Sequence, residues 1–280
     1  MHAPISLSDT EGCEAEALLQ FETGAPQAVR SALGINAARV EDVVVLSMRN
    51  DPTRYWSKAL GFGRTTAVTA DLVAEVCAFY RAEGTPVAFL QLAPSAIPED
   101  WDDICGREGI TGGSTLVKLV AEVNEVLARV DRPDRRPVNE VHVAAVEPED
   151  ADRWASVMMR AFGMPHEHYA QMTAASAVHP DWYPQAAWLA DELVGTGTMY
   201  RGGRTAQLFG GAVLPHARNR GGHTELLAAR ARIAHELGCR LVVTEAEAEN
   251  DGSHNPSLHN SLGLGFQVVY ERQNWVWQPR

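Results

Sequence analysis

The chain lacks most of the features that mark secreted and membrane proteins. Its 280 residues contain only four cysteines, and no two of them form a Cys-x-x-Cys pair. Scattered cysteines are typical of reduced, buried side chains in a cytoplasmic protein. Residues 1–8 hold neither a basic segment nor an apolar one, and no apolar run elsewhere approaches a membrane span in length. We therefore expect a soluble, cytoplasmic protein without a secretory signal and without a membrane partner.

Positive charge is also scarce. Lysine and arginine number 24 against 36 aspartates and glutamates, which gives a formal net charge of −12. An acidic chain of this kind is not expected to bind nucleic acid or anionic lipid in general, although a local basic pocket is still compatible with a small polyanion. Hydrophobic residues make up 45% of the chain, as in globular proteins, and its length allows two domains.

The most informative segment is residues 210–227. It reads Gly-Gly-Ala-Val-Leu-Pro-His-Ala-Arg-Asn-Arg-Gly-Gly-His-Thr-Glu-Leu-Leu. An apolar strand leads through a proline and a basic, glycine-containing turn into the start of a long helix. Free N–H groups and partial positive charge at a helix start bind anions, and glycine lets a phosphate approach the backbone. The segment therefore predicts a pyrophosphate site. The alternative is an ordinary connection with exposed arginines.

A boundary is predicted near the middle of the chain. Residues 132–137 read Arg-Pro-Asp-Arg-Arg-Pro, and prolines at this spacing are typical of an extended connector. We divide the chain there into residues 1–136 and residues 137–280.

The second half has the pattern of alternating strands and helices. Apolar and polar spacing predicts the following elements in order: a strand over 138–146, a helix over 149–162, strands over 186–190, 195–200 and 205–213, a helix over 222–237, a strand over 241–246, a short helix over 256–262 and a strand pair over 267–277. Residues 201–204, Arg-Gly-Gly-Arg, supply a turn.

Two segments of this half carry a resemblance to a known family. Residues 218–223, Arg-Asn-Arg-Gly-Gly-His, match the pattern [Arg/Gln]-x-x-Gly-x-[Gly/Ala] except at His223. Residues 255–260, Asn-Pro-Ser-Leu-His-Asn, lead to Gly265-Phe266 as in a helix that closes over a cofactor before the next strand. Residues 138–277 thus resemble the GNAT superfamily of coenzyme A-dependent N-acyltransferases.

The resemblance implies a fold and a cofactor site. We expect an α/β chain with mixed sheets, organised as two GNAT-like domains, each a mostly antiparallel sheet flanked by helices. Acetyl-CoA is the expected cosubstrate, held where two parallel strands part. The residues expected to bind it are Ala212 and Val213 on the strand, Arg218, Asn219, Arg220, Gly221, Gly222, His223 and Thr224 at the diphosphate, and Asn260 near the pantetheine arm.

The first half resembles a degenerate repeat of the second. A shift of 154 residues places 71–84 over the helix that ends at Gly238, and 87–92 over the strand 241–246. The same shift puts Ala67 and Val68 on the two loop glycines, so a branched side chain stands where a phosphate would approach. We expect this half to be a partner domain that does not bind the cofactor. A different small domain, marked by residues 55–63, is the alternative.

Two residues are candidates for acid–base chemistry. Acyl transfer to an amine requires proton removal, polarisation of the carbonyl and departure of a thiolate. Glu245, at the end of its predicted strand and two residues before Glu247, is the candidate base; a solvated acidic run over 245–251 is the alternative. Ser261 stands where many members of the superfamily have a tyrosine acid, and a serine hydroxyl is a poor donor to a thiolate.

We expect no metal ion. His166-Glu167-His168 lacks a third ligand at motif spacing, while His254 and His259 are interpreted as capping or surface residues with a general-base role left open. The expected acceptor is a small and, given the acidic run, cationic amine, and a homodimer is allowed for. The alternatives to an acyltransferase are a coenzyme A-binding sensor or scaffold without catalysis, and a nucleotide or phosphate site unrelated to coenzyme A.

Overall fold

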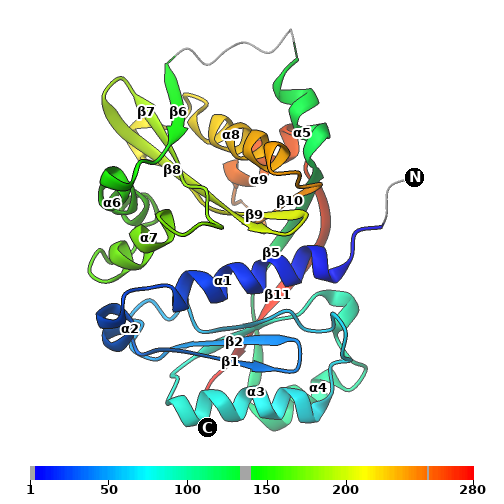
Figure 1. Ribbon diagram of the computed structural model, residues 1–280. Helices are drawn as coiled ribbons and strands as arrows, with labels where there is room; N and C mark the ends of the chain where they lie inside the picture. Colours follow the sequence, from blue (N-terminus) through cyan, green and yellow to red (C-terminus); the bar gives the residue numbers. More distant parts are fainter. Residues whose placement is uncertain (1–3, 133–139, 251) are drawn as a thin grey trace. The chain divides into compact units, whose positions relative to one another are not determined.

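The computed structural model of the chain, drawn in Figure 1, describes residues 4–132, 140–250 and 252–280. Its contacts divide the chain into two compact units. The first contains residues up to 23, 27–118 and 269–280, and the second contains residues 24–26 and 119–268. Both units combine a mixed sheet with flanking helices, which confirms the predicted fold class. Among the described residues, no helix has the length and apolar character needed to cross a bilayer.

The first unit is built on the strand order β1-β2-β3-β4-β11. The pairs β1–β2, β2–β3 and β4–β11 are antiparallel, and β3–β4 is parallel. Helices α1 and α3 both contact β1 and β2, and Figure 1 shows them on opposite sides of these strands. The elements are η1 (Ser8–Gly12), α1 (Cys13–Thr23), α2 (Gln27–Leu33), β1 (Ile35–Val40), β2 (Val43–Met48), β3 (Lys58–Leu60), α3 (Ala70–Glu83), β4 (Ala88–Gln91), η2 (Pro94–Ala96), α4 (Trp101–Glu108), the first part of β5 (Ile110–Glu122) and most of β11 (Gln267–Trp277).

The second unit has the strand order β10-β9-β8-β7-β6. Its strands β6 to β9 form antiparallel pairs in succession, and β9–β10 is parallel. Helix α8 packs against β6, β8 and β9. The elements are α5 (Val123–Val130), β6 (Val141–Ala145), η3 (Pro148–Asp150), α6 (Ala151–Phe162), α7 (Tyr169–Ala177), β7 (Gln185–Leu189), β8 (Glu192–Gly202), β9 (Thr205–Val213), η4 (Pro215–Ala217), α8 (Gly222–Glu236), β10 (Leu241–Glu247) and α9 (Pro256–Gly263).

The division by contacts crosses the predicted boundary at residue 136. Residues 119–130 lie with the second unit, and residues 269–280 lie with the first. Strands β5 and β11 therefore each contain residues of both units. The predicted connector lies outside the described residues except for Arg132. The division of the chain into two domains, residues 1–136 and residues 137–280, stays a prediction.

The order of elements repeats along the chain, as the shift of 154 residues predicts. Shifted by this amount, α3 falls on α8, β4 on β10, α4 on α9 and β5 on β11. In each unit a helix connects the two strands of the parallel pair, namely α3 between β3 and β4, and α8 between β9 and β10. The tandem arrangement is thus present in the topology.

Two predicted elements of the second half differ from the structure. Helix α7 is missing from the prediction because its small residues, such as Ala174 and Ala177, give no clear apolar stripe. The expected strand pair over 267–277 is the single strand β11, which contains no glycine or proline to form a turn. The other strands and helices expected there are found, with ends shifted by a few residues.

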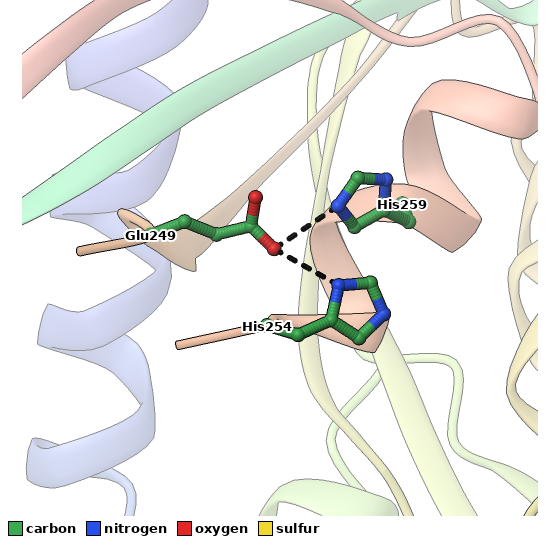
Figure 2. A group of neighbouring side chains, drawn as sticks. All are labelled: Glu249, His254 and His259. Atoms are coloured by element: carbon green, nitrogen blue, oxygen red, sulfur yellow. Dashed lines mark hydrogen bonds and ion pairs between the residues drawn. The ribbon is translucent and has the colours of Figure 1, made fainter. Parts of the chain in front are cut away.

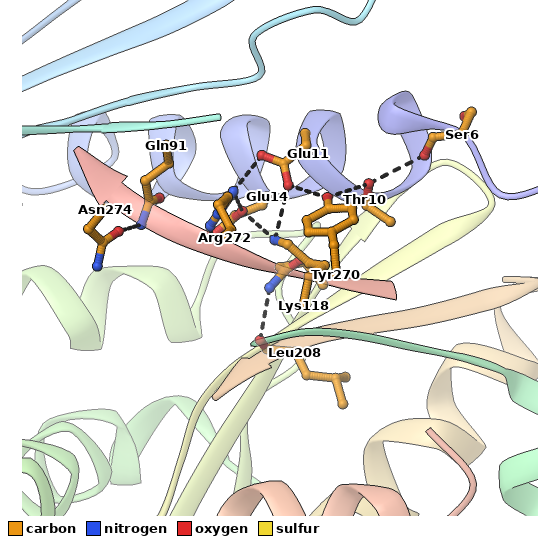
Figure 3. A network of polar contacts seen from close by, with 11 residues as sticks. Ser6, Thr10, Glu11, Glu14, Gln91, Lys118, Leu208, Tyr270, Arg272 and Asn274 are labelled. Carbon is orange, nitrogen blue, oxygen red and sulfur yellow. Dashed lines mark hydrogen bonds and ion pairs between the residues drawn. The ribbon is translucent and has the colours of Figure 1, made fainter. Parts of the chain in front are cut away.

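A network of buried charges holds the first unit together (Figure 3). Nζ of Lys118 lies 2.6 Å from the carboxylate of Glu14 and 3.8 Å from that of Glu11, and neither the Lys118 nor the Glu11 side chain is exposed. The Arg272 guanidinium, also without exposed surface, bonds both carboxylates. The Tyr270 hydroxyl donates a hydrogen bond to Glu11. The pKa of Tyr270 is raised, chiefly by burial and then by the negative charge of Glu11. Two cations and two anions are thus balanced away from water.

Lys118→Met should destabilise the protein. Two buried carboxylates would then share one guanidinium, and removal of one partner from a buried ion pair costs about 3 to 5 kcal/mol. The free energy of unfolding in urea measures this loss. The matched control is Arg39→Met, because the Arg39–Glu16 pair is largely exposed and such pairs contribute about 0 to 1 kcal/mol. Equal losses in both variants would contradict a special role for the buried network.

Candidate functional site

The parallel strands of the second unit part along their length. Their register runs from Thr205 opposite Leu241 to Gln207 opposite Val243 and ends there, although β9 continues to Val213 and β10 to Glu247. On its other edge, β9 stays paired with β8 as far as Val213. Over its last six residues, the edge of β9 that faces β10 is therefore not paired with β10 in that register. Such an edge can pair with an extended ligand.

A bulge in β9 follows the end of its register with β10. The register between β8 and β9 shifts between Thr196 and Thr198. Gly210 has φ of +61°, and a Cβ there would lie 2.5 Å from Met158 Cε of α6, so no other residue fits without displacement. The next residue, Gly211, instead faces the guanidinium of Arg230 on α8, since a Cβ there would lie 3.1 Å from Nη2. The bulge thus brings α6 and α8 close to the backbone of β9 on opposite faces.

Arg230 is a buried cation beneath this bulge. Its residue is 1% exposed, and its guanidinium donates to the carbonyls of Leu226 (2.9 Å), Thr198 (3.3 Å) and Phe209 (3.3 Å). Within the described ranges no carboxylate lies at ion-pair distance from it. Burial lowers the pKa of Arg230 to about 10, so the side chain keeps its charge at neutral pH. Three carbonyl dipoles therefore compensate one buried charge.

The start of α8 has no side-chain cap. Its N-cap residue, Gly221, has φ of +77°, and Asn219 also has a left-handed φ of +63°. The described part of the chain supplies no acceptor for the main-chain N–H groups of residues 219–224, and the first such bond of this helix runs from Glu225 to the Gly221 carbonyl. Alternating left-handed residues at a helix start form a concave set of donors that suits an anion. The donors expected at the diphosphate are thus open.

The two arginines of the loop are engaged at its edges. Arg218 is exposed, and its Nε donates to the Val213 carbonyl at 3.2 Å, which fixes the turn against the end of β9. Arg220 forms an exposed ion pair with Glu140 at 2.7 Å. An exposed pair of this kind is weak, so Arg220 is able to exchange its partner for another anion.

His223 departs from the family pattern, and its ring links α8 to α9. The ring Nδ1 lies 3.4 Å from Nδ2 of Asn260, and Nε2 lies 3.3 Å from Oγ of Ser257. Because an amide nitrogen only donates, the network assigns the ring proton to Nε2. Burial, and then the charge of Arg230, lower the pKa of His223 to about 4. The imidazole is therefore neutral at physiological pH.

The remaining predicted residues are distributed around the parted strands. Ala212 and Val213 pair with β8 at Thr196 and Gly195. Gly222 and Thr224 lie in the first turn of α8, Gly222 being buried. Glu245 is half-buried on β10, two residues past the end of the register.

Ser261 and the acidic run complete the set. Ser261 is 2% exposed, and its hydroxyl donates to the Ser257 carbonyl at 3.0 Å. Of the acidic run, Asp251 lies outside the described residues.

The corresponding loop of the first unit is closed by its own side chains. Oδ2 of Asp42 accepts the N–H groups of Thr65 (2.6 Å) and Thr66 (3.4 Å). Thr69 caps α3 by accepting the N–H of Leu72 at 3.2 Å. A carboxylate and a hydroxyl of the protein thus take the donors that remain open at α8. This contrast supports the prediction that the first half does not bind the cofactor.

Sequence analysis missed the roles of Arg230 and of the His223 ring. Arg230 falls among apolar residues on the inner face of α8, at a position between Leu227 and Ala231. The sequence signal that could have indicated a buried Arg230 is the pair of glycines at 197 and 211, which leave room for its guanidinium. A Cβ at Gly197 would lie 3.0 Å from Cζ of Arg230. Nothing local in the sequence indicates the contact of His223 with α9, which lies 34 residues away.

Comparison with known proteins supports the topology. Residues 150–256 match the model of the acetyltransferase (GNAT) family. Similar solved structures include a GCN5-related N-acetyltransferase from Kribbella flavida (17% identity, 95% of each chain, TM-score 0.63). They also include a tandem GNAT protein from the clavulanic acid biosynthesis pathway (18% identity, 99% of this chain and 98% of that one, TM-score 0.58). A conserved protein of unknown function from Staphylococcus epidermidis is similar as well (14% identity, 92% and 100% coverage, TM-score 0.59). No curated protein sequence matches the chain.

His223→Gln should make the stability less sensitive to acid. The folded pKa of about 4 lies below that of a free histidine, so the unfolded chain takes up a proton first as the pH falls. Stability is then lost from about pH 6.5 down to about pH 4, by roughly 3 kcal/mol. Urea unfolding at pH 7, 5.5 and 4.5 measures the slope, which should be shallower in the variant than in the native chain.

The control for this measurement is His216→Gln. His216 belongs to the same loop but its side chain is 52% exposed. His216→Gln should change the slope of stability with pH less than His223→Gln does. A native slope retained in His223→Gln would show that His223 is not held neutral by burial.

Proposed function

We propose, from the match of residues 150–256 to the model of the acetyltransferase (GNAT) family, that the chain moves an acetyl group from acetyl-CoA to the amine of a small acceptor. The observation that carries the proposal is the pairing of two features in one unit. Strand β9 parts from β10, and the main-chain donors of residues 219–224 are open at the start of α8. The two features together suit an extended ligand that ends in a diphosphate.

The residues of the site fit such a ligand. The N–H groups of residues 219–224 take the diphosphate, with Arg218 and Arg220 adding positive charge. The open edge of β9 at Ala212 and Val213 pairs with the amides of the pantetheine arm. Arg218 uses one lone pair of the Val213 carbonyl and leaves the second available. Asn260 contacts the arm from α9.

The chemistry requires three groups. Bound acetyl-CoA would supply a thioester. In the reaction, the acetyl carbon forms a C–N bond to the acceptor and its C–S bond to coenzyme A breaks. Glu245, which lies on β10 beyond the paired region, takes a proton from the ammonium group of the acceptor, and the neutral amine that results attacks the thioester carbonyl. A main-chain N–H of β9 near Val213 donates to the carbonyl oxygen as its negative charge grows. The positive charge of Arg230 beneath the bulge favours the same development of charge.

Ser261 favours a second candidate function. The proton of its hydroxyl is directed into its own helix, at the Ser257 carbonyl. A serine so placed is a poor acid for a leaving thiolate, and the thiolate then leaves as the anion or no transfer takes place. The second candidate is accordingly a coenzyme A-binding sensor or scaffold. It shares the cofactor site and lacks turnover.

Gly221→Glu should abolish coenzyme A binding. The side chain would place bulk and negative charge among the donors that hold the diphosphate. Isothermal titration with coenzyme A measures the loss. The matched control is Gly238→Glu, because Gly238 also has a left-handed φ, of +74°, but lies beyond the other end of α8 with no atom within 4 Å of its Cβ position. Both variants carry the same strain and the same added charge. Unchanged affinity in a folded Gly221→Glu protein would rule out the site.

Release of free thiol from acetyl-CoA in the presence of a panel of amines tests catalysis. The acyltransferase predicts amine-dependent release, with cationic amines preferred. Glu245→Gln should lower kcat by about a hundredfold or more, because a general base contributes at least this factor. Glu247→Gln, an exposed carboxylate two residues further along β10, is the control and should stay close to the native rate. Coenzyme A binding without thiol release from any amine would favour the sensor.

A further inference from the structure

Three metal-ligating side chains converge beside α9 (Figure 2). They are Glu249, which follows β10, His254 in the connecting loop, and His259 in α9. Oε1 of Glu249 lies 3.3 Å from Nδ1 of His254 and 3.0 Å from Nε2 of His259. The three ligand atoms lie within 4.8 Å of one another. Both rings therefore direct a nitrogen at one carboxylate oxygen.

The arrangement is held by the backbone around it. Nδ2 of Asn255 donates to the Glu247 carbonyl at 2.8 Å, and its main-chain N–H donates to Oε1 of Glu249 at 2.6 Å. The Asn255 carboxamide oxygen also caps α9 by accepting the N–H of Ser257 at 3.0 Å. One residue thus fixes the carboxylate against the start of the helix that carries His259. The two imidazoles are stacked, with ring centroids 4.6 Å apart.

The donor set is that of a first-row transition metal. Zinc–nitrogen and zinc–oxygen bonds are about 2.0 to 2.2 Å long, so two ligand atoms of a tetrahedral site are about 3.3 Å apart. The separations of 3.3 Å and 3.0 Å from Glu249 to the two imidazoles are close to that value. Two imidazoles with one carboxylate select zinc, nickel, copper or cobalt, while magnesium and calcium prefer oxygen ligands. The donation from Asn255 to Glu249 matches the outer hydrogen bond that usually orients a metal-bound carboxylate.

We propose that Glu249, His254 and His259 bind one divalent transition-metal ion, with zinc as the expected occupant. The side chains are 32%, 69% and 50% exposed, so the fourth position is open to water. This inference replaces the expectation that the chain holds no metal and does not depend on the proposed acyl transfer. Sequence analysis missed the site because the spacing Glu-x4-His-x4-His belongs to no familiar zinc motif.

The metal would cross-link α9 to the chain that follows β10. It joins the end of β10 to the helix whose Ser257 and Asn260 contact His223 of α8. Binding to the folded chain alone stabilises it by mass action. The expected function is to hold α9 in place against α8 and β10.

Metal binding is tested on the full chain prepared without a histidine tag and stripped with a chelator. Cobalt(II) should bind with about one equivalent per chain and show the visible absorption of a tetrahedral site, and zinc should displace it. Zinc should also raise the thermal unfolding midpoint. His259→Ala should weaken cobalt binding by at least about tenfold and remove the zinc-induced rise in the midpoint. His254→Ala, which alters a largely exposed ring, tests the same site should His259→Ala fail to fold.

The control is the double variant His166→Ala, His168→Ala. It removes two neighbouring histidines outside the cluster, of which His166 contacts Ser156 at 2.8 Å and His168 lies 3.8 Å from Glu167. It should bind cobalt as the native chain does. Failure of the native chain to take up cobalt or zinc would overturn the proposal, as would equal uptake in the native chain and in His254→Ala. Loss of uptake in the His166/His168 variant alone would assign the metal to that pair instead.

Discussion

The buried charge of Arg230 is the constraint on which the shape of the candidate site depends. A guanidinium without exposed surface must find acceptors, and the acceptors here are carbonyls on β8, β9 and its own helix. Glycines at 197 and 211 leave room for it there, because a Cβ at either position would lie about 3 Å from its atoms and would displace them. The bulge of β9 and the position of α8 are thereby fixed together. The register of β9 with β10 ends just before the bulge, at Gln207.

The same topology is used differently in the two units. Each has a parallel strand pair joined by a helix, and each helix starts after a loop that contains an arginine. In the first unit Asp42 and Thr69 satisfy the donors of that loop and helix start. In the second unit Gly221 replaces the cap and leaves the donors open. The difference lies in a few side chains, so one copy of the fold retains an anion site and the other is closed.

The helix α9 connects the features of the second unit. Through Ser257 and Asn260 it contacts the neutral ring of His223, and through Asn255 it is tied to the end of β10. An imidazole at position 223 occupies space that a small residue would leave empty. It makes the approach of α9 to α8 dependent on two polar contacts of 3.3 and 3.4 Å.

Much of the second half could be predicted from residues close in sequence. Alternation and helical spacing predict β7 to β10 and α8, and the glycine and proline positions mark their ends, because these signals arise from local backbone preferences. The loop at 218–224 is predictable for the same reason, since its donors belong to consecutive residues. Helix α7 and the single strand β11 could not be predicted in this way, because a run of small residues and an uninterrupted strand carry weak local signals.

The sequence by itself determined the order of the elements, the repeat and the glycine-containing start of α8, since each depends on near neighbours in the chain. Only the tertiary structure decided that β9 parts from β10, that Arg230 is buried against main-chain carbonyls, and that strands β5 and β11 each contribute to both compact units. It also decided which side chains meet at His223 and at Glu249. Pairing between distant strands and the burial of charge are set by the whole packed unit, and no local pattern of residues encodes them.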